Sequence, residues 1–220
     1  MSRTVKRHYD SSRRQEQSAE TRRRIIAAAR ELFIRRGYGQ ATIAQIAETA
    51  GLAVETVYAT FRNKAALLRQ GWFVDFRGDE DEAPLFDRAE MQSILAEPDL
   101  PELIRKLAAF VTRTNVRMAP LVDALIGAAA SEADAVKMLA EWSERRIDVA
   151  TKSARAAAGT GQLAIPEDDC RDILYATMDG ALWRRLVVER GWSDQRYAEW
   201  LAALWASQFV SRTTSRRRGR

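Results

Sequence analysis

Cysteine and histidine are almost absent from the 220 residues, which contain one of each, Cys170 and His8. A single cysteine can neither form an internal disulfide nor supply a cysteine cluster for zinc, and its scarcity fits a reducing cytoplasm. The only histidine lies in an N-terminal segment without a hydrophobic pattern. Ser-His-Asp and Cys-His catalysis and histidine-containing zinc sites are therefore excluded.

Long apolar runs and phosphate-binding loops are missing as well. No apolar stretch reaches the roughly 18 residues that cross a membrane, and residues 1–17 contain no apolar segment that would act as a secretory signal. No glycine-rich phosphate loop is present. We expect a cytoplasmic protein without a membrane segment, a metal or a cofactor. Catalysis by paired carboxylates stays open, but no such pair marks the sequence, and the prediction is that the chain is not an enzyme.

Positive charge is concentrated at the two ends of the chain. Residues 1–36 hold eleven Lys or Arg against four Asp or Glu, a net charge of +7, and residues 212–220 add five Arg and no acid. A basic end on an acidic body favours a polyanionic partner such as nucleic acid. Residues 1–17 and 213–220 are predicted to be flexible basic segments. For the first of them, non-specific attraction to phosphate is favoured over insertion into a narrow minor groove.

Apolar residues recur at spacings of three and four, with no convincing strand pattern and no internal repeat, so the predicted fold class is all-α with about nine helices. The first helix is expected to begin at Ser18, its N-cap, and to end at Gly37. Later breaks are predicted at GDEDEAP (78–84), Pro120 and Ser131. The acidic stretch is interpreted as a solvated break rather than a metal site, because no ligands at fixed spacing accompany it.

Caps and helix stops outline the C-terminal half. Asp99, followed by Glu102 three residues later, is expected to open a helix. A long helical run covers residues 133–158. Pro166, with three acids behind it, starts a helix predicted to continue to Gly191. Ser193 is expected to cap the last helix.

Two short helices are predicted to meet at Gly51. Thr42 and Gln45 form the capping-box pattern that starts the first helix, and residues 54–61 form the second. Ala47 is small enough for the helices to cross closely, and Gly51 can adopt the left-handed backbone that costs other residues about 1 kcal/mol or more. This helix-turn-helix would hold its second helix outward, where a DNA major groove can admit it.

The wider pattern around this motif is specific. Residues 25–68 resemble the DNA-binding domain of TetR-type transcriptional regulators. The shared residues include Ile25, Ala28, Phe33, Gly37, Thr42, Ile46, Ala47, Ala50, Gly51, Thr56, Tyr58, Phe61, Lys64 and Leu67. The resemblance implies a three-helix DNA-binding domain at residues 18–66, followed by an effector-binding and dimerisation domain at 67–212. The second domain agrees with the family only in length and helix count.

The resemblance also implies residues that contact DNA. Those expected at the phosphate backbone are Thr42, Thr56, Tyr58, Thr60 and Lys64. Those expected at base edges are Val54, Glu55 and Ala59, through thymine methyl groups and a cytosine amine. The alternatives are a half-buried core aromatic for Tyr58, an ordinary surface lysine for Lys64, and solvent exposure for the base-edge residues.

Three positions depart from the family pattern. Ala53 replaces the usual Ser or Thr cap of the recognition helix, a loss of about 0.5 to 2 kcal/mol, which Glu55 partly compensates through the helix dipole. Thr60 replaces a common histidine, and Ala44 replaces a frequent arginine. These departures leave the predicted fold unaffected. They mean that the bases this chain reads cannot be carried over from the family pattern.

The last two helices carry the features of a dimer interface. Small residues beside apolar ones allow a close crossing in the first, and a broad apolar face runs along the second. The residues are Ile173, Thr177, Gly180 and Ala181, then Trp200, Leu204, Trp205 and Phe209. A four-helix bundle between two chains is predicted, because the resemblance favours a homodimer. Packing of both faces inside one chain is the alternative.

The helices between the two ends are expected to enclose an effector pocket. Candidate lining residues are Trp72, Phe76, Phe86, Phe110, Met118, Met138 and Trp142. For any single one of these residues, a place in a plain hydrophobic core is the favoured alternative. Acids such as Asp123 or Glu141 near such a pocket would suit a cationic or flat ligand.

The function predicted from these patterns is a dimeric, ligand-responsive repressor that binds a palindromic operator in double-stranded DNA. An effector would shift the fourth helix, which starts at Lys64, and so change the separation of the two recognition helices. The alternative is a helical adaptor that binds another protein through its Trp-rich C-terminal face. That alternative leaves the pattern from Thr42 to Lys64 unexplained.

Overall fold

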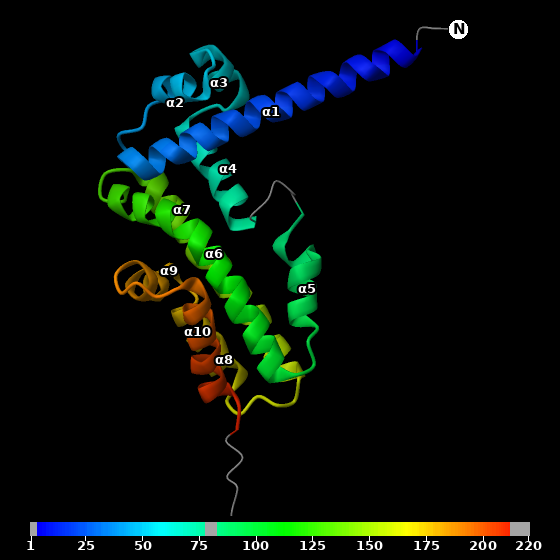
Figure 1. Ribbon diagram of the computed structural model, residues 1–220, viewed down its shortest axis with the longest axis vertical. Helices are drawn as coiled ribbons and strands as arrows, with labels where there is room; N and C mark the ends of the chain where they lie inside the picture. The colour runs from blue at the N-terminus through cyan, green and yellow to red at the C-terminus, as the bar shows by residue number, and fades with distance from the viewer. Residues whose placement is uncertain (1–3, 78–82, 212–220) are drawn as a thin grey trace, which may run out of the picture. The chain divides into compact units, whose positions relative to one another are not determined.

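The computed structural model describes residues 4–77 and 83–211, and gives only the backbone for residues 4–12, Asp75 and Arg77. Ten α-helices make up most of this part of the chain (Figure 1). They are α1 (Thr4–Arg36), α2 (Ile43–Ala50), α3 (Val54–Thr60), α4 (Lys64–Arg77), α5 (Ala89–Leu95), α6 (Leu100–Ala128), α7 (Ala133–Gly159), α8 (Glu167–Thr177), α9 (Gly180–Trp183) and α10 (Asp194–Phe209). The 3₁₀ turn η1 (Leu85–Asp87) precedes α5, and the π-helical turn η2 (Arg184–Val188) follows α9. The predicted all-α class is confirmed, and the described residues pair in β fashion only at an isolated bridge between Leu163 and Val210.

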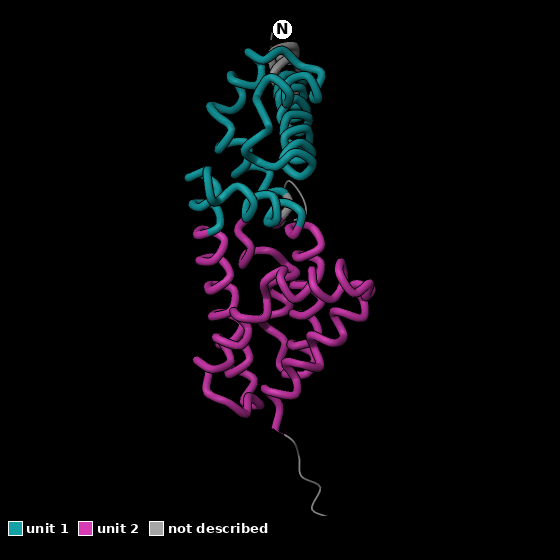
Figure 2. Tube along the Cα trace, turned by 90° about the vertical axis from the view of Figure 1, so that its left-hand side faces the viewer, with its two compact units in different colours: residues 1–75, 120–139 teal, residues 76–119, 140–220 magenta. Residues whose placement is uncertain are grey.

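The chain divides into two compact units (Figure 2). The first comprises residues 1–75 and 120–139, and the second comprises residues 76–119 and 140–220. Helices α4, α6 and α7 contribute residues to both units, so this division differs from the boundary predicted at residue 67. None of the helices within residues 4–77 and 83–211 combines the length and apolar character needed to span a bilayer.

The core of the first unit holds the two short helices against α1. Its largest contributions include Ile25, Phe33, Ile46, Val57 and Leu67, each at most 1% exposed. They come from four different helices, and burial of each such side chain stabilises the fold by about 1.5 to 3 kcal/mol. The hydrophobic spacing seen in the sequence therefore becomes one shared core.

The first helix is longer than predicted. α1 begins at Thr4 rather than at Ser18, so the predicted flexible arm at residues 1–17 is wrong for residues 4–17. The prediction relied on the lack of hydrophobic periodicity, which governs packing and not helix formation. The helix contains neither proline nor glycine, and its Arg, Gln, Glu and Ala residues are good helix formers. Ser18 is an exposed residue inside the helix and not its N-cap.

Pro120 lies inside α6 and does not end it, contrary to prediction. A proline removes one backbone hydrogen bond and crowds the preceding turn. The apolar stripe nevertheless continues through Leu121 and Leu125, both at most 1% exposed, and this burial offsets the lost bond. The break comes after Ala128, close to the predicted Ser131. Residues 78–82 of the other predicted break lie outside the described residues.

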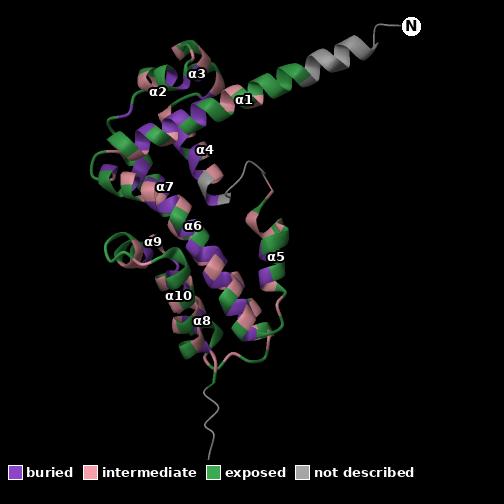
Figure 3. Ribbon diagram, viewed as in Figure 1, coloured by how far each residue is buried: buried purple, intermediate pink, exposed green. Residues whose placement is uncertain are grey.

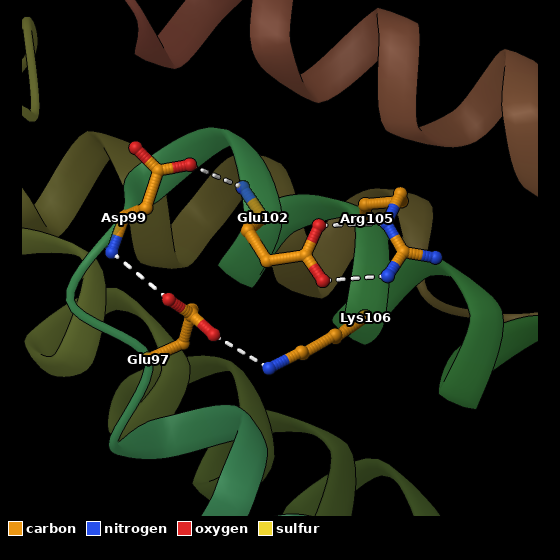
Figure 4. Close-up of polar contacts among 5 residues, drawn as sticks. All are labelled: Glu97, Asp99, Glu102, Arg105 and Lys106. Atoms are coloured by element: carbon orange, nitrogen blue, oxygen red, sulfur yellow. Dashed lines mark hydrogen bonds and ion pairs between the residues drawn. The ribbon is translucent and has the colours of Figure 1, made fainter.

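Two predicted helix starts are confirmed by hydrogen bonds. Asp99 accepts one from the Glu102 amide at 3.2 Å, and Ser193 accepts one from the amide three residues on, also at 3.2 Å. Around the start of α6, the Lys106 ammonium donates to Glu97 at 2.5 Å (Figure 4). That hydrogen bond is the main reason that the pKa of Glu97 lies below its ordinary value. The Asp99 carboxylate thus bonds a backbone amide at the start of α6 that has no acceptor within the helix.

The helix predicted over residues 166–191 is split in two. α8 ends at Thr177, and α9 begins after Asp179, whose carboxylate accepts a hydrogen bond from the Ala181 amide at 3.0 Å. An aspartate that caps a new helix competes with continuation of the old one, and Gly180 is a poor helix former. This break adds one helix, α5 (Ala89–Leu95) adds another that was not predicted, and the continuous α6 removes one, so ten helices occur where about nine were predicted.

Two residues predicted for the dimer face belong instead to the core of the second unit. Trp205 and Phe209 are 0% and 1% exposed, and the Trp205 indole donates a hydrogen bond to the Thr177 hydroxyl at 2.8 Å. Trp200 and Leu204 are only partly buried, and α10 as a whole mixes buried, intermediate and exposed residues (Figure 3). Packing inside one chain, the alternative for this helix, therefore holds for the first pair.

Candidate nucleic-acid interface and ligand cavity

The turn between α2 and α3 has the predicted backbone geometry. Thr42 accepts a hydrogen bond from the Gln45 amide at 3.2 Å, and the Thr42 amide donates to the Gln45 side chain at 3.1 Å, which completes the capping box. Gly51 has φ 63° and ψ 42°, in the left-handed region. The Leu52 amide then bonds to the Ala47 carbonyl at 2.9 Å. The glycine ends α2 and redirects the chain into α3, as the sequence predicts.

Arg24 of α1 fixes this turn from outside. Its Nη2 donates to the Ala50 carbonyl at 2.5 Å and to the Gly51 carbonyl at 3.3 Å. These carbonyls lie at the end of α2, where a cation is favourable. The basic N-terminal run had suggested that such arginines attract DNA. Arg24 is a structural clamp, and nothing in its local sequence indicated a partner 26 residues away.

α3 presents most of its side chains to solvent. Of residues Val54–Thr60, only Val57 is buried. Tyr58 is 55% exposed, which excludes the half-buried core aromatic that was its alternative. Glu55 and Ala59 are also exposed. As expected from the sequence, Ala53 at the N-cap makes no side-chain hydrogen bond, and Glu55 lies in the first turn.

The four other residues predicted to contact the phosphate backbone differ in their surroundings. Thr42 is exposed and Thr56 is partly exposed. The Thr60 hydroxyl donates to the Thr56 carbonyl at 2.8 Å, so its only proton already has an acceptor. The Lys64 ammonium donates to the Tyr38 carbonyl at 2.9 Å and lies 4.3 Å from the centroid of the Tyr38 ring. Lys64 therefore has a structural task besides the predicted phosphate contact.

An open groove of about 480 Å³ lies beside the end of α3 and the start of α4. It is lined by Arg22, Thr60, Phe61, Arg62, Asn63, Ala65, Ala66, Arg69 and Gln70. The Arg22 guanidinium lies 4.8 Å from the centroid of the Phe61 ring, and Asn63 caps α4 by accepting from the Ala66 amide at 2.8 Å. Three arginines from α1, the loop and α4 thus surround one groove. The sequence did not reveal this grouping, because it requires α1 and α4 to lie together.

The predicted effector residues fall into two groups. Phe76, Phe110 and Trp142 line one cavity in the second unit. The others do not line it: Trp72 and Met138 are buried in the first unit, Met118 is buried in the second, and Phe86 contacts the Lys152 ammonium at 3.5 Å from its ring centroid. Aromatic and methionine side chains at helical spacing serve either purpose, so only the tertiary structure separates them.

The cavity is small and largely apolar. Its lining consists of Phe76, Phe110, Val111, Thr114, Asn115, Trp142, Arg145, Arg146, Val149 and Met178. The Phe76 and Trp142 rings meet edge to face with centroids 5.3 Å apart. Its volume of about 30 Å³ holds one or two water molecules by this measure. Ligand sites usually measure about 300 Å³ or more, so side chains must move before a ligand could enter.

The charged residues of the cavity lining are both arginines. Neither Asp123 nor Glu141, the acids expected near the pocket, belongs to the lining. The Arg146 side chain is 15% exposed, and its Nη1 lies 3.3 Å from Asp179 Oδ2. Its Nε is buried and has no hydrogen-bond partner among the described residues. The electrostatics of this lining do not suit the cationic ligand that the sequence suggested.

Comparison with known proteins places the helix-turn-helix in a family. Residues 25–70 match the model described as bacterial regulatory proteins, tetR family. The chain is also similar to the HTH-type transcriptional regulator TtgR of Pseudomonas putida, with 44% identity over 57 residues. This alignment covers 26% of the present chain and 27% of TtgR. The likeness in sequence to this relative is therefore confined to about a quarter of each chain.

Two solved structures share the fold over most of their length. A transcriptional regulator from Saccharomonospora viridis in complex with choline has a TM-score of 0.65 at 21% identity, covering 88% of this chain and 100% of that one. NalD, the secondary repressor of the MexAB-OprM multidrug efflux pump in Pseudomonas aeruginosa, has a TM-score of 0.62 at 19% identity, covering 89% and 98%. At these identities the likeness concerns the fold.

Proposed function

We propose that the chain is a regulator of the tetR family, whose model its residues 25–70 match, and that it acts as a sequence-specific, dimeric transcriptional repressor whose operator affinity is changed by a small molecule. The observation that carries the proposal is the exposed face of α3. Val57 anchors the helix, while Glu55, Tyr58 and Ala59 face solvent. A major groove about 12 Å wide admits such a helix, and side chains on it can reach base edges.

Contacts to phosphate would position this helix. Thr42 is exposed at the N-cap of α2, and the partly exposed Thr56 lies in the first turn of α3. Hydroxyl and backbone N–H groups at helix starts bind phosphate oxygens. The arginine-lined groove next to α3 supplies positive charge through Arg22, Arg62 and Arg69. Such contacts give affinity for any sequence, and the residues on α3 add the discrimination.

A homodimer would double this readout. Two copies of α3 related by a two-fold axis would enter grooves about 34 Å apart or a multiple of it, which requires a palindromic operator. The face that remains for a partner includes the partly buried Ile173, Trp200 and Leu204, together with Val188, which is 63% exposed. Apolar residues left uncovered on two helices favour a bundle with a second copy.

Ligand control would act through α4. Its first residue, Lys64, is bonded to the loop after α1, and Phe76 near its other end lines the cavity. A ligand that moves Phe76 would change the position of α4 and thereby the placement of α3 in the grooves. A coupling of about 1 to 3 kcal/mol suffices for such control. The choline complex and the repressor NalD, both similar in fold, support a ligand-responsive repressor.

Fluorescence anisotropy of labelled genomic fragments across a salt series tests DNA recognition in the absence of any effector. We expect the protein to bind some fragments with much higher affinity than others, and its affinity for every fragment to fall as the salt concentration rises. Tyr58→Ala should weaken binding to every fragment by about tenfold or more, because Tyr58 is expected at the phosphate backbone and a hydrogen bond to a charged group is worth about 1.5 to 3 kcal/mol.

Val136→Ala is the matched control, since Val136 is 51% exposed and lies on α7 rather than α3. It should bind like the wild type. Equal retention of every fragment, or an equal effect of the two substitutions, would overturn the proposed DNA recognition and favour the adaptor alternative.

A further inference from the structure

Arg146 is one of the residues that line the cavity of the second unit, and its hydrogen bonding is incomplete at the buried Nε. Its side chain is only 15% exposed, and its Nε reaches neither solvent nor any acceptor among the described residues. A buried donor left without an acceptor destabilises a protein, and more so when the donor is charged. The arrangement becomes favourable if the side chains of the lining move and let an acceptor reach Nε.

The acid beside Arg146 is already occupied elsewhere. Asp179 approaches Nη1 at 3.3 Å, a long contact for an ion pair. Its other carboxylate oxygen caps α9 through the Ala181 amide, and its carbonyl accepts from the Asn115 amide group at 3.4 Å. Asp179 thus shares its charge between Arg146 and a helix N-terminus, and leaves Nε unbonded.

The remainder of the lining favours a flat apolar body. Phe76, Phe110 and Trp142 contribute aromatic surface, and Val149 and Met178 add aliphatic surface. Aromatic ligands pack against such rings edge to face or with an offset. Arg145 adds a second positive charge to the same lining. No carboxylate of the described residues belongs to it, so a cationic ligand would meet like charge there.

From these features we infer that the effector, whose existence rests on the proposed function, is an aromatic anion such as an arene carboxylate. Its carboxylate binds Arg146 at the Nε edge, next to and not at the Nη1 contact of Asp179, and the two carboxylates share the charge of one guanidinium. The ring of the ligand lies against Trp142 and Phe76. Guanidinium and carboxylate groups match in planar, two-bonded geometry, which makes arginine the suited side chain for this head group.

The position of Asp179 gives this binding a structural consequence. Asp179 stands between α8 and α9, after Met178, which itself lines the cavity. When a ligand carboxylate bonds to Arg146 and draws the guanidinium toward itself, the 3.3 Å contact of Asp179 across to α7 weakens, while Asp179 still caps α9 and accepts from Asn115. The junction between α8 and α9 is then held less tightly to α7. Ile173 of α8 belongs to the face proposed for the partner chain, so ligand binding would act on that face.

Isothermal titration calorimetry of the full-length protein without DNA tests the ligand class. The probes are 1-naphthoate, the neutral 1-naphthalenemethanol and the cationic 1-naphthylmethylammonium, which share one ring system. We expect naphthoate to bind about tenfold tighter than either analogue, the difference made by one charge-assisted contact. Arg146→Gln should remove this preference and leave the weak binding of the alcohol unchanged.

Two further variants separate recognition from folding. Arg155→Gln, on the same helix but with a side chain 77% exposed, should behave like the wild type. Asp179→Asn should bind naphthoate more tightly than the wild type, because a competing carboxylate is gone and an asparagine still caps α9. A side chain with only a structural role would not tighten binding when replaced.

Three results would overturn the inference. They are equal affinity for the three probes, no heat from naphthoate at millimolar concentration, and equal behaviour of Arg146→Gln and Arg155→Gln. Each would leave sequence-dependent retention of DNA intact, because that measurement contains no ligand. Loss of DNA retention by the wild type would instead count against the proposed function.

Discussion

Lys64 links two segments of the first unit at the scale of a single residue. Its ammonium donates to the Tyr38 and Gly39 carbonyls at 2.9 and 3.4 Å, and so ties the start of α4 to the loop after α1. An ammonium has three donors, and two of them are used here. The group can still present charge to a phosphate, but from a position that the loop carbonyls fix.

Lys64→Ala should therefore have two separate effects. We expect a loss of about 1 kcal/mol in unfolding free energy, the typical net worth of a hydrogen bond, measured by chemical denaturation. Binding to all DNA sequences should weaken, and the slope of log K against log salt should fall by about one if Lys64 neutralises one phosphate.

The two readouts of Lys64→Ala are independent. An unchanged salt slope would show that Lys64 makes no phosphate contact, whatever happens to stability. An unchanged unfolding midpoint would show that the carbonyl contacts contribute nothing. Lys137→Ala, an exposed lysine of α7, provides the control and should alter neither quantity.

Residue roles that depend on neighbours in sequence were predictable, whereas those that depend on distant partners were not. The Thr42 cap and the Gly51 conformation follow from residues within a few positions. The Arg24 clamp and the Lys64 contacts join residues 26 apart. A sequence pattern shows Arg24 and Lys64 only as positive charges. The role predicted for them, attraction to DNA phosphate, follows from that charge alone.

At the scale of elements, the α2–α3 turn depends on one backbone conformation. Gly51 lies at φ 63°, and a Cβ added there would lie 3.1 Å from Arg24 Nη2. The strain is therefore twofold, from the left-handed backbone and from crowding of the side chain that clamps α2. The angle between the two short helices, and hence the exposure of α3, depends on this position.

Gly51→Ala should lower the unfolding free energy by about 1 to 2 kcal/mol, through a left-handed non-glycine residue and the displaced Arg24. Gly127→Ala is a sharp contrast, because Gly127 lies in α6 with nothing within 4 Å of an added Cβ. That change should stabilise the protein by up to about 1 kcal/mol through helix propensity. Chemical denaturation of both variants measures the difference, and a neutral Gly51→Ala would show that the turn does not require its glycine.

Helix existence followed from the sequence more reliably than helix length. Apolar spacing and caps located α2, α3, α4, α7 and α10. α1 extends beyond its apolar stripe on helix propensity alone, and α6 continues through Pro120 because buried leucines lie on both sides of the lost bond. The break between α8 and α9 depends on whether Asp179 caps a new helix or α8 continues through it. The spacing of apolar residues does not distinguish these two outcomes.

At the scale of the whole molecule, the proposed dimer depends on residues that one chain leaves partly uncovered. Trp205 and Phe209 are core residues, so removing residues 202–220 would damage the second unit itself and could not report on association. Leu204 is a better probe, because it is partly exposed on α10 and lies four residues from Trp200 on the same face.

Leu204→Glu should yield folded monomers, because a carboxylate buried between two copies would lie unpaired opposite its own symmetry mate. Size-exclusion chromatography with light scattering measures the mass, and circular dichroism should show unchanged helix content. Operator affinity should fall by far more than tenfold, since a monomer reads one half-site. Gln195→Glu adds the same charge nine residues away, on the opposite side of α10, and should remain dimeric. A Leu204→Glu protein that kept the dimer mass would place the interface on another face, and retained operator affinity in a true monomer would remove the need for two-fold readout.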